Sequence, residues 1–115
     1  MTQWSGATVQ KWLESRVVAA RADQVEAQRA ARSQHDDCDK ATAEEMVCTI
    51  LLEKPTMQEP KAFTADLRAL LDRDAYFCRG VYNDVRFDRH VRTFIRKLLK
   101  MTKTNTGFDR TGRYQ

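Results

Sequence analysis

Five cations recur at helical spacing in the last quarter of the chain, and their spacing suits phosphate binding. Successive residues of a helix are rotated by about 100° about its axis. If Arg89 is placed at zero, the other four cations lie within about 60° of it on one side and about 20° on the other: Arg92, Arg96, Lys100 and Lys103. At about 1.5 Å per residue, these cations extend over about 21 Å. Phosphates along a nucleic-acid strand can neutralise them, and the release of counterions then drives binding.

Further basic and aromatic residues surround these five cations. Lys97, Arg110 and Arg113 widen the predicted nucleic-acid-binding surface. Phe108 and Tyr114 stand among the basic residues, where an aromatic ring can stack on an unpaired base. The alternative is a cationic face that contacts an acidic protein or is only solvated.

Metal binding is the second function that these residue types could support. His35, Cys38 and Cys48 occur close together in the sequence, with His90 or Cys78 as a fourth ligand. His35 and Cys38 have the spacing of half a zinc site, but no CxxC, CxxH or HxxxH pair supplies the other half. We therefore expect no metal and no other cofactor, and we expect Cys48 and Cys78 to be buried as small apolar side chains.

Catalysis has little support in the sequence. The acidic run DDCD, residues 36–39, lacks the glycine and the glutamate that an EF-hand loop requires. Neither a nucleophile motif nor a glycine-rich phosphate loop is present. We expect a protein that is not an enzyme and has no small-molecule substrate.

The elements that must position these residues are predicted to be helices. Glycine and proline are scarce, and apolar residues recur at helical rather than alternating spacing. The prediction is an all-α fold, a four-helix bundle with an extended first inter-helix segment and an additional C-terminal basic helix. The bundle is expected over residues 1–102, with core helices at about 8–22, 42–54, 60–73 and 74–86, the basic helix at about 88–102, and a flexible tail at 103–115.

Local signals set these predicted boundaries. Residues 19–32 favour a solvated helical extension, and residues 33–40 read as a loop before a capping box of Thr42 and Glu45. Pro55 ends the second helix, while Pro60 suits the first turn of the third. Asp74 is predicted to cap the fourth helix.

The apolar stripes of these helices predict a common core. Lys11, Glu14 and Arg16 are expected off the apolar face of the first helix, which centres on its tryptophan. Trp4 either caps the end of the core or anchors a partner. The predicted core residues are Trp12, Leu13, Val47, Ile50, Leu51, Phe63, Leu67, Leu70, Leu71, Phe77 and Val81.

Composition and charge place limits on function. The chain has 115 residues, of which 42% are hydrophobic and 31% charged, as in one small globular domain. No apolar run is long enough to cross a membrane, and three cysteines without a CxxC pair suit a reducing compartment.

The charge is distributed unevenly along the chain. Residues 1–85 carry eleven Lys or Arg against fourteen Asp or Glu, whereas residues 86–115 carry nine against two. The positive excess therefore lies entirely at the C-terminal end, as in proteins that bind polyanions.

Three stretches together resemble the PWI domain, a small helical bundle of pre-mRNA splicing and RNA-processing proteins. They are WLESRV (residues 12–17), EEMVCTILLEK (44–54) and EPKAFTADLRALLDRDAYFCRGVYNDV (59–85), which cover about half the chain when the long first linker is set aside. The last stretch contains the Pro60-Lys61 helix start and an Asp74-Ala75-x-Phe77 motif. The family's Pro-Trp-Ile motif here reads Lys11-Trp12-Leu13, and the connection from the first helix to the second is longer than usual.

The resemblance implies a nuclear module that binds RNA, DNA or both with little sequence preference. Other splicing proteins are possible partners, and we expect a monomer. The main alternative is a protein–protein module of a splicing-related assembly, with an exposed apolar patch near Trp4 or Val25. A helix-turn-helix DNA binder is a weaker alternative, because the start of the third helix offers only one basic residue, Lys61.

Overall fold

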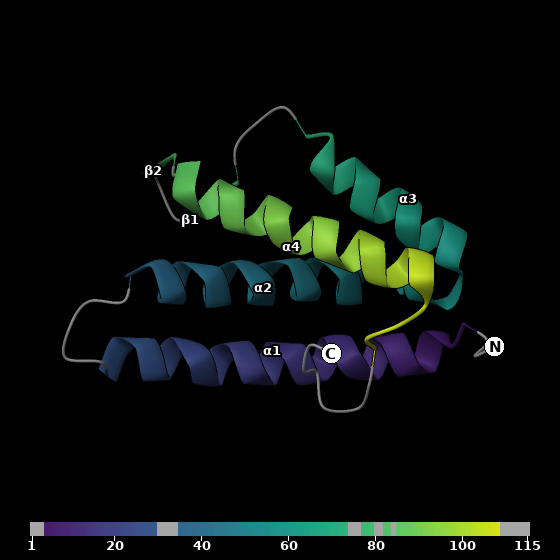
Figure 1. Ribbon diagram of the computed structural model, residues 1–115, viewed down its shortest axis with the longest axis horizontal. Helices are drawn as coiled ribbons and strands as arrows, with labels where there is room; N and C mark the ends of the chain where they lie inside the picture. The colour runs from purple at the N-terminus through teal and green to yellow at the C-terminus, as the bar shows by residue number, and fades with distance from the viewer. Residues whose placement is uncertain (1–3, 30–34, 74–76, 80–81, 84, 109–115) are drawn as a thin grey trace.

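The computed structural model describes residues 4–29, 35–73, 77–79, 82–83 and 85–108. Successive helices run in alternate directions, and α2 packs against both α1 and α4 while α3 packs against α4 (Figure 1). The expected all-α class and four-helix bundle are confirmed. The helices are α1 (Gly6–Arg29), α2 (His35–Glu53), the 3-10 helix η1 (Pro55–Gln58), α3 (Pro60–Leu71) and α4 (Val85–Thr104). Within the described ranges, no helix is long and apolar enough to cross a membrane.

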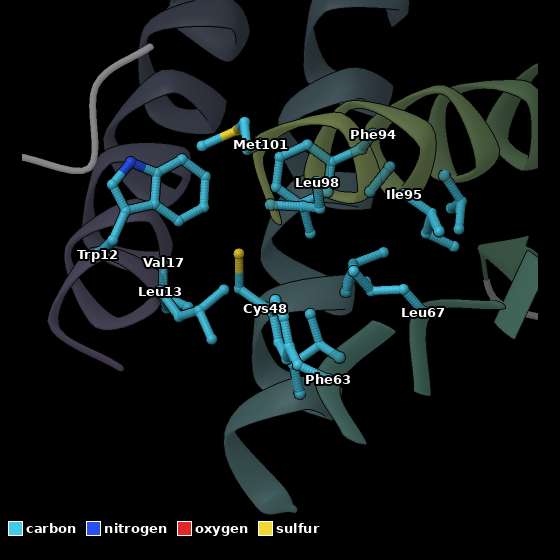
Figure 2. Close-up of a cluster of buried hydrophobic side chains, with 14 of the residues drawn as sticks. Trp12, Leu13, Val17, Cys48, Phe63, Leu67, Phe94, Ile95, Leu98 and Met101 are labelled. Atoms are coloured by element: carbon cyan, nitrogen blue, oxygen red, sulfur yellow. The ribbon is translucent and has the colours of Figure 1, made fainter. Parts of the chain in front are cut away.

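The core lies where all four helices converge (Figure 2). Trp12 and Leu13 of α1 are fully buried, and the Trp12 ring stacks on Phe94 of α4 with centroids 6.4 Å apart. Of the predicted core residues, seven are buried: Trp12, Leu13, Val47, Leu51, Phe63, Leu67 and Phe77. Ile50, Leu70 and Leu71 are only partly buried at the edge of the core, and Val81 lies outside the described residues.

The connection between α1 and α2 is shorter than predicted, because both helices extend into it. Ser5 caps α1, its hydroxyl oxygen accepting a hydrogen bond from the Thr8 amide at 3.2 Å, so the helix starts at Gly6 rather than near Thr8. The predicted loop at 33–40 is wrong from His35 onward, where α2 already runs. Thr42 therefore caps nothing: inside α2, its hydroxyl donates to the Cys38 carbonyl at 2.8 Å.

The two prolines act as predicted. Pro55 starts the short η1, and Pro60 occupies the first turn of α3. Trp4 contacts η1, because its Nε1 donates a hydrogen bond to the Met57 carbonyl at 2.9 Å. The Trp4 ring also packs against Phe63. Of the two roles left open for Trp4, the structure shows the first, a cap on the end of the core.

The predicted helix at 74–86 is wrong in its described part. Strands β1 (Cys78–Arg79) and β2 (Tyr82–Asn83) form an antiparallel two-stranded sheet, with Cys78 paired to Asn83 and Arg79 to Tyr82. The expected cap at Asp74 lies outside the described residues. The basic helix is thus a member of the four-helix bundle instead of an addition to it.

The chain after α4 also departs from the expected tail. Thr106 donates its amide to the Met101 carbonyl at 3.1 Å, and Asn105 adopts a φ of 52°, an arrangement that commonly ends helices. Gly107 has a φ of 91°, which glycine adopts readily. These turns bring Phe108 against the core, with its ring 5.3 Å from that of Trp12.

Candidate nucleic-acid interface

The candidate site lies on α4, whose two faces differ sharply in chemistry. Its apolar face is buried against α2 and α3, through Phe87, Val91, Phe94, Ile95, Leu98 and Met101. This packing fixes the rotation of the helix about its axis. The opposite face therefore has to point away from the core, and it carries four exposed cations, which we call the basic row: Arg89, Arg96, Lys100 and Lys103.

The basic row has no acidic neighbour on its own helix that could neutralise it. Asp88 is the single acidic residue of α4, and it is 5% exposed. Its carboxylate accepts hydrogen bonds from the Phe77 amide and from Arg92, both at 2.9 Å. Among the described residues, no ion pair joins an acid to any member of the basic row. The row thus presents positive charge over about 21 Å of helix, and no described acidic side chain forms an ion pair with it.

Arg92, predicted as a phosphate ligand, has a structural role instead. Its Nε pairs with Asp88 at 2.9 Å, and its two terminal nitrogens donate to the carbonyls of Leu71 at 2.5 Å and Arg73 at 2.7 Å. These carbonyls belong to the C-terminal end of α3 and the residues after it, where a cation is favourable. Arg92 therefore joins α3 to α4, and we leave it out of the basic row, so that its contact with nucleic acid stays a prediction.

Lys97 and Arg86 extend the cationic surface on one side of the row. Both side chains are exposed. Partial burial lowers the pKa of Lys97, while the nearby Glu44 carboxylate acts in the opposite direction. Lys97 thus lies between the basic row and the buried Glu44, and we keep it as a candidate nucleic-acid contact at the margin of the site.

Of the C-terminal residues predicted to take part in the site, the structure describes only Phe108. Phe108, predicted to stack on a base, instead packs edge-on against Trp4, Trp12 and Phe63 at the end of the core. Its partly buried ring is used in packing, and its stacking on a base stays a prediction. Arg110, Arg113 and Tyr114 lie outside the described residues.

A buried ionic cluster between α1 and α2 was missed by sequence reasoning. Arg16 is 6% exposed rather than on the outer face, and its guanidinium pairs with Asp23 at 2.9 Å and approaches Glu44 at 3.9 Å. Burial raises the pKa of Glu44 despite the opposing effects of Arg16, Lys40 and Lys97. The signal was present in the sequence, because at about 100° per residue Arg16 falls between Trp12 and Leu13 on the apolar side of α1.

Metal binding gains no support from the described part of the chain. No group of three or more His, Cys, Asp or Glu side chains there is placed to hold a metal ion. Cys38 and Cys48 are both buried, and burial raises the pKa of Cys48, which disfavours the thiolate that metals bind. The side chains of His35 and Cys78 lie outside the described residues.

No protein-family model, no curated protein and no solved structure matches the chain. Its function has to be argued from the geometry of its own residues.

Proposed function

We propose that the chain is a nucleic-acid-binding module that recognises the phosphate backbone of RNA or DNA with little sequence preference. The observation that carries this proposal is the basic row, which is held outward by the buried face of α4 and has no described acid paired to it. The resemblance to PWI domains supports the further proposal of a nuclear pre-mRNA splicing or RNA-processing factor.

Binding would follow from the shape of the row. A nucleic-acid strand in duplex carries one phosphate per about 3.4 Å of axis, so about six phosphates match the length of the row. Lysine and arginine contact phosphates without reading bases, and contacts of this kind position a strand but do not select a sequence. No described aromatic ring stands exposed beside the row to stack on bases, since Phe108 is packed on the core.

Fluorescence anisotropy with labelled single-stranded RNA and duplex DNA tests the proposal. In the test variant, Arg89→Gln, Arg96→Gln and Lys100→Gln remove three charges of the row. The matched control, Lys54→Gln, Lys61→Gln and Arg68→Gln, removes three exposed charges elsewhere. We expect the test variant to lose most binding at low salt and the control to keep it. Equal losses in the two folded variants would show that only net charge matters.

The second candidate function is a protein–protein module without direct nucleic-acid contact. The exposed valines of α1, Val18 at 67% and Val25 at 48%, are the observation in its favour. A partner bound through apolar contacts would remain bound at moderate salt, whereas a phosphate-directed complex would dissociate.

A further inference from the structure

The outward face of α1 exposes two large apolar side chains on one side of the helix. Val18 is 67% exposed and Val25 is 48% exposed, and their spacing of seven residues places them about 20° apart around the helix. Ala22, between them, is exposed as well. The buried side of α1, with Trp12 and Leu13, faces the core, so nothing in the described core covers this stripe.

The charges at the two ends of the stripe are opposite in sign. Glu14 precedes Val18 by one helical turn, and Arg29 follows Val25 by one turn; both are exposed. The residues along this face are therefore, in order, Glu14, Val18, Ala22, Val25 and Arg29. This pattern is complementary to itself when reversed. In an antiparallel pair with a two-fold axis between Arg21 and Ala22, Val18 lies opposite Val25 and Glu14 opposite Arg29.

The middle of the face is suited to close approach of a second helix. Ala22 has a small side chain, and the Arg21 side chain is held toward α2 by its ion pair with Glu45 at 2.8 Å. Gln24 also hydrogen bonds to Glu45, at 2.5 Å. Packed helices lie about 8–10 Å apart, which requires small or displaced side chains at the crossing point.

A shallow groove borders the stripe and adds apolar surface. It runs between α1 and α2, where Val17 and the partly buried Leu52 line its floor and Glu14, Arg21, Thr49 and Glu53 surround it. Long side chains from a helix laid on the stripe can enter this groove. The apolar surface near the axis is then bordered by charged residues, as at many protein interfaces.

We propose that α1 is a homodimer interface, in which two copies of the chain pair their α1 helices antiparallel about a two-fold axis. The symmetric match of Glu14 with Arg29 identifies the occupant as a second copy, because such an interface must be complementary to itself. The α1 helix is about 36 Å long, so one helix pair buries little area and the dimer is weak. This inference departs from the expected monomer and does not depend on the basic row.

Sedimentation equilibrium of the full chain over a wide concentration range tests the dimer. Glu14→Arg and Arg29→Glu each place like charges opposite one another at two symmetric positions. We expect each variant alone to self-associate roughly tenfold more weakly, since two exposed attractive pairs become repulsive. Mixed in equal amounts, the two variants should associate again, because each then meets opposite charges on the other.

The control is Arg68→Glu, which makes the same charge change on an exposed position of α3. It should self-associate like the unchanged chain, and circular dichroism should show the same helix content for all variants. The proposal is overturned if the chain stays monomeric at all concentrations. A chain that stays monomeric and binds a different protein through its α1 face overturns it as well. Equal weakening by Arg68→Glu, or no recovery in the mixture, overturns it too.

Discussion

At the scale of single residues, the surroundings decide what each charge does. Arg89 and Arg92 lie on the same helix within one turn of each other. Arg89 is exposed, whereas Arg92 bonds to Asp88 and to two backbone carbonyls at the end of α3. The same side-chain type is therefore a candidate phosphate ligand at one position and a structural tie at the other.

Substituting these two arginines should have very different effects on stability. Arg92→Gln breaks charge-assisted hydrogen bonds in a partly buried site, and we expect the free energy of unfolding to fall by about 2–3 kcal/mol. Arg89→Gln should change it by less than about 0.5 kcal/mol, as is usual for exposed positions. Urea denaturation followed by circular dichroism measures both. Similar losses from the two substitutions would contradict the assigned roles.

Glu44 makes stability depend on pH in an unusual direction. Burial raises its pKa in the folded state, so between the usual glutamate pKa and this raised value the folded chain binds more protons than the unfolded chain. The contribution of Glu44 to the free energy of unfolding therefore decreases as pH rises through this window. The free energy of unfolding of the unchanged chain minus that of Glu44→Gln should therefore be larger near pH 4 than near pH 7.

Glu45 provides the control for this pH effect. Its hydrogen bond with Arg21 lowers its pKa, so its contribution to stability is present at neutral pH and is lost as pH falls. Urea denaturation at several pH values should show opposite trends for Glu44→Gln and Glu45→Gln relative to the unchanged chain. Parallel trends would mean that the Glu44 carboxyl is not buried as described.

At the scale of elements, the clearest sequence patterns predicted the structure best. The amphipathic pattern of α4 and the two prolines gave boundaries within three residues of those observed, because each depends on local chemistry. The pairing of β1 with β2 is not predicted, since short segments are compatible with either helix or strand until packing decides. The structural role of Arg92 could not be predicted, because helical spacing gives the direction of a side chain but not the carbonyls at the end of a neighbouring helix.

The start of α1 offers a test of packing between elements. Alanine favours helix more than glycine does, so Gly6→Ala would stabilise an isolated helix. Here a Cβ at Gly6 would meet the side chain of Gln58 and would lie 2.7 Å from its Cα, so α1 and η1 would have to separate. We expect a loss of about 1–3 kcal/mol, measured by urea denaturation. An increase in stability would show that the two elements are not in contact.

At the scale of the whole molecule, different helices carry the two proposed surfaces. The basic row belongs to α4 and the apolar stripe to α1, while α2 packs against both helices and holds them in one bundle (Figure 1). Substitutions on one surface should therefore leave the other intact. A chain with both Glu14→Arg and the three row substitutions should lose each property independently.

The salt dependence of nucleic-acid binding tests the central claim most directly. Anisotropy titrations with labelled single-stranded RNA, from about 50 to 200 mM salt, give the slope of log affinity against log salt concentration. Neutralising about four phosphates predicts a slope of about −3, and the variant with Arg89→Gln, Arg96→Gln and Lys100→Gln should reduce its magnitude by about 2. A slope near zero, or no binding by the folded chain at the lowest salt, would contradict the proposal that the basic row binds phosphates.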